Sequence, residues 1–311
     1  MKLNIYYLQN PPYMRYHGHF FTKFSKLLSS NHDCNVDVSK GDKKDSKWPV
    51  TIKDVDMFIE NAETKKFVIV SASNQIGATM GMCSKIPEVS KIYMCHFNQN
   101  YIYKHLIKEK KVNRLSLYEP LFFPMSDDLD FEKYYKDRKS VEKYIDKIHF
   151  RGTGIGSHRQ TIKEFLKFEE FAGGYPMDYR QFYPELIKYK MAMAFYVDFN
   201  LNWYGEFCYR DTEFMALGIP YIRLEYRNTC HDPIIPNKHY ISVDRETAYL
   251  AYEKEGNYGV AKAHIDRFNE VKDDADYLSW VANNGREYYL KNCNWPNSGL
   301  NLMSRIEKDL S

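Results

Sequence analysis

Short apolar runs that alternate with amphipathic or charged stretches most constrain the fold of this 311-residue chain. The first run, residues 2–8, is followed by a polar, proline-rich loop and then by a helical pattern. A strand followed by a helix is the repeating unit of a mostly parallel sheet with helices on both faces. Further strand-like runs in the first half begin near residues 55, 66, 91 and 115. The chain is therefore predicted to be an α/β protein.

A strongly charged stretch at residues 127–146 divides this pattern into two halves. The second half repeats the rhythm and includes a helix predicted at 158–170 and a long helical tail at about 262–291. A chain of this length commonly forms two domains, and two similar α/β halves imply a cleft between them. We predict two Rossmann-like domains facing a cleft. The predicted bounds are residues 1–135, residues 136–285 and a C-terminal helical segment at 286–311.

Bulk properties argue against several classes of partner. The 44 Lys and Arg residues nearly balance the 41 Asp and Glu residues, and a net charge of +3 is too small to indicate nucleic acid as a partner. The six cysteines form no CxxC pair, so we interpret them as mostly reduced thiols. No leader peptide and no apolar run near the roughly 20 residues of a membrane span is recognisable. We expect a soluble, unprocessed chain.

The stretch at residues 147–166 indicates an anion site. An apolar run leads into three glycines and two arginines within residues 151–159, and a helical pattern follows. The start of a helix offers unpaired N–H groups, and glycine lets the backbone approach a ligand closely. A phosphate or diphosphate is the anion that fits best. The alternative is that Arg151 and Arg159 form surface or interdomain salt bridges.

A second cluster, residues 203–224, carries the pattern Arg-x-x-Glu-x-x-Ala-x-Gly-Ile-Pro after a Tyr-Gly turn. Arg210 and Glu213 are three residues apart, so on a helix they share a face. Together with the upstream FRGTG turn and its following Arg, this pattern resembles the C-terminal domain of exostosin-like and CAP10-like glycosyltransferases of the GT-B fold. The resemblance covers about residues 145–225, and the first half shows none of the family's N-terminal signatures.

The resemblance implies a pocket for the nucleotide diphosphate of a donor sugar. It implies that Arg159 and Arg210 pair with diphosphate oxygens, and that Glu213 accepts a hydrogen bond from a ribose hydroxyl or orients Arg210. Tyr204 is a candidate to stack on the nucleobase or sugar, although a core tyrosine is an equal alternative. The donor-binding residues predicted in this way are Arg151, Gly152, Thr153, Arg159, Tyr204, Arg210 and Glu213.

An inverting transferase also needs a base for the acceptor hydroxyl. His17 and His19 follow the first predicted strand, and imidazole titrates close to neutral pH. Asp198, at the end of the strand predicted at 191–199, is a third candidate. The alternatives are that the histidines cap or pack a helix and that Asp198 closes a turn.

These observations predict a glycosyltransferase that moves a sugar from a nucleotide-diphosphate donor, with a UDP-sugar favoured, to a hydroxyl of a glycan or glycoprotein. The resemblance implies inverting chemistry. No metal or cofactor is expected, because guanidinium groups stabilise the leaving diphosphate. Residues 1–135 are expected to hold the acceptor and 136–285 the donor. The resemblance implies that the last helix crosses back to the first domain. The predicted location is the cytoplasm.

The richness in Lys, Asn, Tyr and Ile resembles compact glycosyltransferases of large DNA viruses or of bacterial surface-glycan pathways. In the viral case the predicted location is the cytoplasm of the host. Two other functions stay open. One is a metal-dependent GT-A transferase that uses the D-x-D carboxylates Asp54 and Asp56. The other is a non-enzymatic module in which the arginines form a basic cleft for polyanions or glycans.

Overall fold

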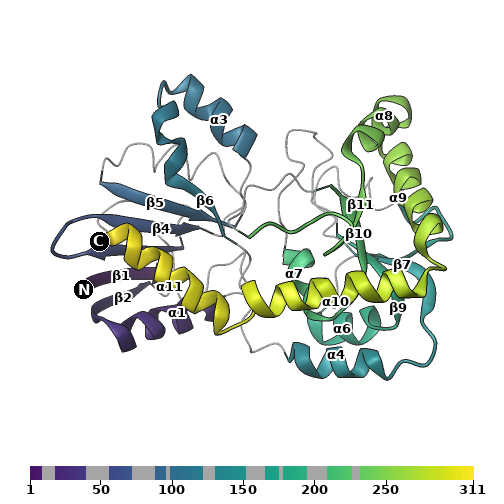
Figure 1. The fold of residues 1–311 in the computed structure, drawn as a ribbon, viewed down its shortest axis with the longest axis horizontal. Helices are drawn as coiled ribbons and strands as arrows, with labels where there is room; N and C mark the ends of the chain where they lie inside the picture. The colour runs from purple at the N-terminus through teal and green to yellow at the C-terminus, as the bar shows by residue number, and fades with distance from the viewer. Residues whose placement is uncertain are drawn as a thin grey trace. The chain divides into compact units, whose positions relative to one another are not determined.

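In a computed structural model of the chain, the described residues are 1–8, 18–39, 56–71, 88–95, 99–121, 130–151, 165–174, 178–194, 209–225 and 232–311. They form two compact α/β units (Figure 1). Unit 1 comprises Met1–Leu129, Thr229–His231 and Lys291–Ser311, and unit 2 comprises Asp130–Asn228 and Asp232–Leu290. Each unit is built on its own sheet, which confirms the predicted α/β class.

The sheet of unit 1 has the strand order β2-β1-β3-β4-β5-β6. Its strands are β1 (Lys2–Leu8), β2 (Asp33–Ser39), β3 (Met57–Asn61), β4 (Phe67–Ser71), β5 (Val89–Met94) and β6 (Tyr118–Pro120). The sheet is mostly parallel, as predicted, and the exception is β3, which runs antiparallel to both β1 and β4. Only residues 62–66 separate β3 from β4. A parallel crossover needs a dozen or more residues, so this link forms a hairpin.

Helices of unit 1 pack on this sheet through apolar residues one turn apart. The helical elements are α1 (Gly18–Asn31), α3 (Gln99–Lys108), the 3-10 helix η2 (Val112–Leu117) and α11 (Asn297–Leu310). In α11, Leu302, Ile306 and Leu310 are buried at four-residue spacing. The Tyr93 hydroxyl donates to Asp309 at 2.6 Å, and Asn61 Nδ2 donates to the Leu310 carbonyl at 3.1 Å. The end of the chain is therefore part of unit 1.

The sheet of unit 2 is parallel throughout, with the order β11-β10-β9-β7-β8. Its strands are β7 (Ile145–Arg151), β8 (Phe171–Gly174), β9 (Tyr189–Met193), β10 (Tyr221–Leu224) and β11 (Ile241–Val243). From β7 the chain moves to one neighbour, β8, and then returns to the other neighbour, β9. This is the strand order of one common doubly wound sheet, and the order reverses between β7 and β9.

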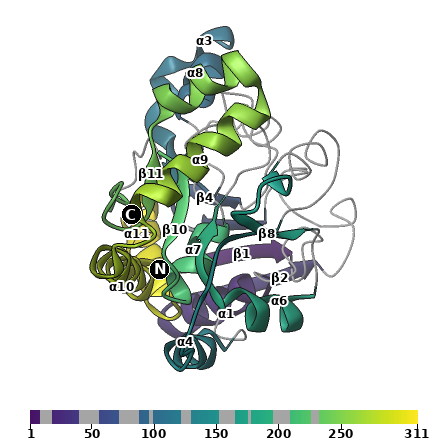
Figure 2. The same cartoon turned by 90° about the vertical axis from the view of Figure 1, so that its right-hand side faces the viewer.

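Helices cover both faces of this second sheet. They are α4 (Phe131–Lys139), α6 (Tyr179–Leu186), α7 (Tyr209–Ala216), α8 (Arg245–Glu255), α9 (Asn257–Val271) and α10 (Ala275–Asn292). Figures 1 and 2 show α8 and α9 on one side of the sheet and α4 and α6 on the other. The long helical tail predicted at about 262–291 consists of two helices, α9 and α10, which are separated by residues 272–274. The predicted helix at 158–170 likewise ends at Phe165, and turns follow it.

Strand β8 has no strand-like sequence, because it reads Phe-Ala-Gly-Gly. Its pairing with β7 explains the glycines. Gly173 has φ of +135°, and a Cβ atom at this position would lie 1.9 Å from the carbonyl oxygen of Phe150. Only glycine allows so close an approach of the two backbones.

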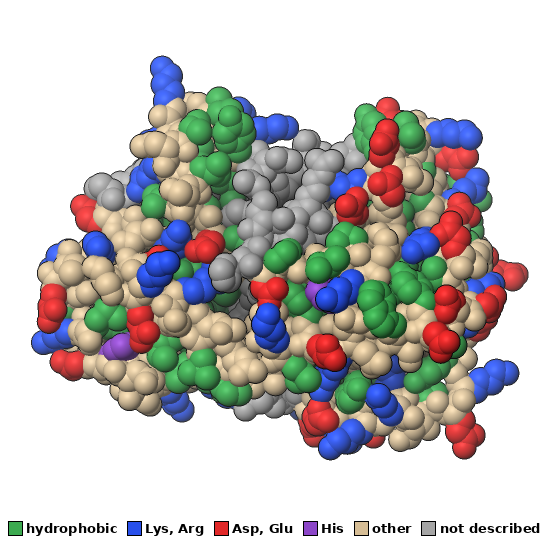
Figure 3. Space-filling view, viewed as in Figure 1, with side chains coloured by type: hydrophobic (Ala, Val, Ile, Leu, Met, Phe, Trp, Pro, Cys, Tyr) green, Lys and Arg blue, Asp and Glu red, His purple; other side chains and the backbone are tan. Residues whose placement is uncertain are grey.

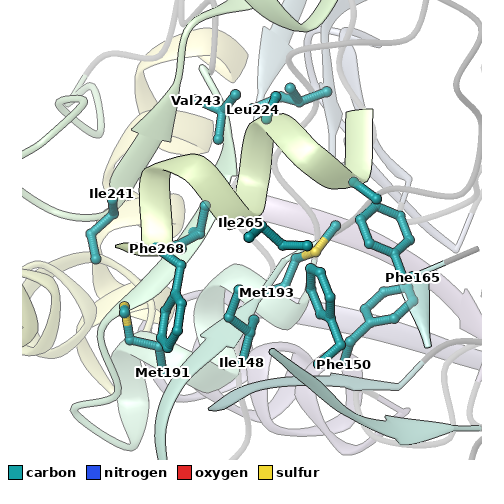
Figure 4. Packing of buried hydrophobic residues seen from close by; sticks show 14 of the residues in the cluster. Ile148, Phe150, Phe165, Met191, Met193, Leu224, Ile241, Val243, Ile265 and Phe268 are labelled. Carbon is teal, nitrogen blue, oxygen red and sulfur yellow. The ribbon is translucent and has the colours of Figure 1, made fainter. Parts of the chain in front are cut away.

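Strand β7 presents different side chains to the two faces. Ile148 and Phe150 are buried in the apolar core against α9, where they meet Ile265 (Figure 4). His149 and Arg151 alternate with them and therefore point to the opposite face, toward α6. The same strand thus supplies the core on one side and polar side chains on the other.

Arg138 on α4 connects α6 and α7 through hydrogen bonds on the face of the sheet opposite α9. The guanidinium is buried and donates to the carbonyls of Ile187 and Tyr189 at 2.8 Å, and to that of Gly218 at 3.3 Å. Burial lowers the pKa of Arg138 to about 10, so the group stays charged at neutral pH. Ile187 closes α6 and Gly218 follows α7, so one cation meets the carbonyl ends of both helices.

Replacement of this cation tests its role. We expect Arg138→Met to lower the free energy of unfolding by about 3 kcal/mol or more, because several buried carbonyls lose a charged donor. Lys133→Met, on an exposed position of the same helix, is the matched control and should change stability by less than about 0.5 kcal/mol. Urea unfolding of both variants makes the comparison. Equal losses would contradict the proposed role of Arg138.

Candidate anion site at the carboxyl end of β7

The carboxyl ends of β7 and β9 are where a doubly wound sheet binds its ligands. Phe165, which precedes β8, packs on the α9 side of the sheet, with its ring 5.9 Å from that of His264. Helices α6 and α7 contact each other on the opposite face. Connections that leave neighbouring strands toward opposite faces open a crevice between them. Arg151 is the last residue of β7, and it lies at this position.

A carboxylate of α6 holds Arg151. Its Nη2 donates to both oxygens of Glu185, at 2.7 and 2.9 Å, and its Nε donates to Oε1 at 3.3 Å. Nε2 of His149 lies 3.2 Å from the same carboxylate. Arg151 is 14% exposed and His149 is 1% exposed. One α6 carboxylate therefore joins both polar side chains of β7.

Arg210 has a similar partner within α7. It is the second residue of the helix, and its Nη1 lies 2.5 Å from Oε2 of the buried Glu213. The hydroxyl of Tyr183 donates to the other oxygen of Glu213. The Arg210 guanidinium also lies over the Phe182 ring, 4.2 Å from its centroid. Arg210 is thus held in one orientation while 22% of its side chain stays exposed.

Helix α6 connects the two arginine pairs. Phe182 and Tyr183 face Arg210 and Glu213, while Glu185 faces β7. The helix begins where Asp178 accepts a hydrogen bond from the backbone N–H of Arg180 at 2.8 Å. The ring of His149 lies 5.6 Å from that of Phe182, so the two arginine pairs share one continuous wall.

The charges of this wall are set by burial and by the arginines. Burial lowers the pKa of His149 from 6.5 to about 4, and the positive charges of Arg151 and Arg210 act in the same direction. His149 is therefore neutral at pH 7. Burial acts to raise the pKa of Glu185, but hydrogen bonds from Arg151 and its charge bring that pKa below the usual 4.5. Burial raises the pKa of Glu213 above 4.5, against the opposing effect of Arg210.

This arrangement suits the binding of an anion. Each guanidinium is oriented before a ligand arrives, and each remains partly exposed. Arginine binds carboxylate and phosphate with the same planar, forked geometry, so phosphate oxygens can replace or join the present carboxylate partners. The neutral imidazole of His149 adds no charge that would repel a cationic ligand or bind a second anion.

The structure brings together Arg151, Arg210 and Glu213 among the predicted donor-binding residues. Of the two roles implied for Glu213, contact with Arg210 is present, and contact with a ribose stays a prediction. His19 lies in unit 1, exposed at the start of α1. The other predicted site residues lie outside the described residues: Gly152, Thr153, Arg159, Asp198, Tyr204 and His17.

Sequence reasoning missed four members of this wall: His149, Phe182, Tyr183 and Glu185. The alternation of β7 held a signal for His149, because a residue two positions from Arg151 shares its face. Glu185 is 34 residues from Arg151 in sequence, and no local pattern connects them.

The carboxylates of the D-x-D sequence lie in different settings. Asp54 lies outside the described residues, whereas Asp56 is fully buried, and its negative charge contributes to raising the pKa of Cys95. In the described part of the chain, no group of three or more His, Cys, Asp and Glu side chains is arranged to hold a metal ion. No helix in that same part combines the length and apolar character that a membrane crossing requires.

No protein-family model and no curated protein sequence matches the chain. Among solved structures, it is similar to a glycosyltransferase from Rickettsia africae, with 11% identity over 92% of this chain and 88% of that one and a TM-score of 0.48. It is also similar to a sucrose-phosphate synthase from Thermosynechococcus elongatus, with 11% identity over 94% of this chain and 93% of that one and a TM-score of 0.49.

A third similar structure is an alpha-glucosyltransferase in complex with UDP-glucose and DNA containing an abasic site. The identity is 11%, the alignment covers 100% of both chains, and the TM-score is 0.49. Because identities and TM-scores are both low, only the chain's own residues can support a function.

The buried histidines predict how stability depends on pH. Burial lowers the pKa values of His149, His239 and His264 from 6.5 to about 4. Below pH 6.5 the unfolded chain binds protons that the folded chain takes up only near pH 4. The free energy of unfolding should therefore be intact above pH 6.5 and fall as the pH is lowered toward 4.

The contribution of His149 can be measured separately by substitution. The lowered pKa of His149 reduces the free energy of unfolding by roughly 2 kcal/mol between neutral pH and about pH 5. His149→Asn removes this titrating group. Between neutral pH and about pH 5, the variant should therefore lose roughly 2 kcal/mol less of its free energy of unfolding than the unmodified protein, as measured by urea unfolding. His19→Asn, at an exposed position, is the control and should lose as much as the unmodified protein. If the pH dependence of stability is unchanged in the His149 variant, the lowered pKa of His149 is not a cause of that dependence.

Proposed function

We propose that this protein is a glycosyltransferase that transfers a sugar from a nucleotide-diphosphate donor to a hydroxyl group of a glycan or glycoprotein. A UDP-sugar is the favoured donor, and inverting transfer without a metal ion is the favoured chemistry. The observation that carries the proposal is the wall formed by Arg151, Arg210 and their carboxylate partners. It lies at the end of the sheet where a doubly wound fold binds ligands.

The proposed mechanism uses the arginines to stabilise the leaving group. When the bond between the sugar and the diphosphate breaks, negative charge builds up on the diphosphate oxygens. Fixed guanidinium groups stabilise that charge more in the transition state than in the bound donor, so they lower the barrier. Glu213 and Phe182 hold Arg210 from two sides, which reduces the reorganisation needed during reaction.

The remaining roles rest on the sequence. Gly152 and Thr153 follow β7 directly, and Arg159 comes eight residues after its end. All three are proposed to complete the diphosphate site. Tyr204 is proposed to stack on the nucleobase or sugar. A base for the acceptor hydroxyl is proposed among His17, His19 and Asp198, and the hydroxyl loses its proton to this base as its oxygen attacks the sugar carbon.

The described residues favour this proposal over the two alternatives. A metal site that includes Asp56 would need a carboxylate that faces an entering ligand, yet Asp56 is fully buried. A basic cleft for polyanions would need positive charge that no neighbouring carboxylate compensates. Arg151 and Arg210 instead each face a carboxylate, which keeps the net positive charge around them low.

A thermal-shift screen of the full chain against UDP, GDP, CDP, ADP and their sugars, each with and without EDTA, tests the function. A ligand that binds only the folded state stabilises it by about 2.7 kcal/mol at 100 times its Kd. We expect one nucleoside diphosphate to raise the melting temperature both with and without chelator. A shift that requires metal would favour the metal-dependent alternative, and the absence of any shift would contradict the proposal.

A matched pair of double variants tests the pocket. Arg210→Ala alone leaves the Glu213 carboxylate buried without its cation, which destabilises the fold, so Glu213→Gln is combined with it. We expect the double variant to bind the nucleotide about 10 to 100 times more weakly than Glu213→Gln alone, because a charge-assisted contact contributes about 1.5 to 3 kcal/mol.

The control uses a similar ion pair on another helix. Arg267 and Glu270 are also three residues apart, with 2.7 Å between their charged atoms on α9. Arg267→Ala combined with Glu270→Gln should bind nucleotide as the unmodified protein does. Equal affinities of the two double variants, measured by calorimetric titration, would place the nucleotide elsewhere.

A further inference from the structure

Helix α3 and the following 3-10 helix expose apolar and cationic side chains side by side. Tyr103 is 45% exposed, Ile107 49% and Val112 41%, and the three lie within ten residues of one another in sequence. Figure 3 shows hydrophobic side chains over α3 with Lys or Arg side chains next to them. We call this region the α3 surface, and it consists of Tyr103, Lys104, Ile107, Lys108, Lys110 and Val112.

The helix geometry separates this surface from the core. Ile102 and Leu106 are fully buried and attach α3 to unit 1. Tyr103 and Ile107 form the next row along the helix, one turn apart, and Lys104 and Lys108 form the row after it. The exposed part of α3 is therefore divided lengthwise into an apolar half and a cationic half.

Charge is concentrated in the same segment. Residues 99–117 hold four lysines and one arginine against the single carboxylate Glu109, so their net charge is +5 − 1 = +4 with histidine neutral. The whole chain has a net charge of +3, so all other residues together sum to −1. In the described residues, no ion pair involves Lys104, Lys108 or Lys110, so their charge is available to a partner.

We propose that the α3 surface binds an anionic membrane surface. Apolar side chains beside a row of lysines match the interface of a bilayer, where the apolar row enters the headgroup region and the lysine stems reach the anionic headgroups. Each lysine near such a surface contributes about 1 kcal/mol, which is about fivefold in affinity. Ile107 and Val112 favour lipid over nucleic acid, because aliphatic side chains offer bases no stacking partner and Tyr103 is the one aromatic ring among the residues of the α3 surface.

This inference does not depend on the proposed glycosyltransferase activity. It concerns a surface of unit 1, whereas the proposed donor site lies in unit 2. In this proposal the α3 surface contacts only the headgroup region of the membrane.

Vesicle flotation of the full chain tests the inference. The probes are vesicles of phosphatidylcholine alone and vesicles in which part of it is replaced by phosphatidylglycerol. We expect binding to the anionic vesicles that weakens with salt. Replacement of Lys104, Lys108 and Lys110 by Gln should weaken it by about 100-fold, given roughly fivefold for each lysine.

A control variant replaces three other exposed lysines of unit 1, Lys2, Lys26 and Lys308, by Gln. It has the same net charge and should keep the binding of the unmodified protein. Equal loss in both triple variants, or no binding to anionic vesicles, would overturn the proposal. Circular dichroism checks that all variants are folded.

A second pair of substitutions separates lipid from nucleic acid. Tyr103→Ser with Ile107→Ser should weaken vesicle binding by at least tenfold, because buried apolar area is lost. The same variants are titrated with a single-stranded and a double-stranded oligonucleotide. Oligonucleotide binding that depends on the three lysines, without vesicle binding, would assign the α3 surface to nucleic acid and refute the membrane proposal.

Discussion

The alternation of side chains along β7 is the constraint on which the site of unit 2 depends. Ile148 and Phe150 must face α9 to complete the core, and the period of two in a strand then directs His149 and Arg151 to α6. A shift of register by one residue would bury the arginine in the apolar core and turn two large apolar side chains toward the polar side chains of α6. Core packing thus determines where the cation of the proposed anion site lies.

The arginines of the site are stabilised by partners that a ligand can supplement or replace. Arg151 bonds both oxygens of Glu185, and Arg210 lies between Glu213 and the face of Phe182. Partly buried guanidinium groups without such partners would cost considerable desolvation energy. The same carboxylates orient the cations before a ligand binds. The stability of unit 2 and its readiness for an anion therefore come from the same contacts.

The two units use their surfaces differently. In unit 2 the arginines near the proposed donor site are neutralised by carboxylates of α6 and α7. In unit 1 the cations of α3 have no such partners among the described residues, and they lie next to exposed apolar side chains. Compensated charge suits a specific, oriented ligand, whereas uncompensated charge suits an extended anionic surface.

Local sequence patterns were sufficient for part of the fold. The apolar runs of β1, β4 and β9 predicted strands, because burial on both faces of a sheet requires continuous apolar residues. Strand β8 was missed, since Gly173 and Gly174 carry no strand preference, and their role appears only when β7 lies against them. The antiparallel direction of β3 is an exception within the mostly parallel sheet, and it follows from the short turn that connects β3 to β4.

By itself, the sequence determined the α/β class and drew attention to Arg151, Arg210 and Glu213. Those inferences depend on periodicity and on residue types at short spacing, which are local properties of the chain. Only the tertiary structure decided that Glu185 and His149 join Arg151, and that Phe182 and Tyr183 orient Arg210 and its carboxylate. Glu185 is 34 residues from Arg151 and Tyr183 is 30 residues from Glu213 in sequence, and the parallel pairing of β7 and β9 with α6 packed across them brings these residues into contact.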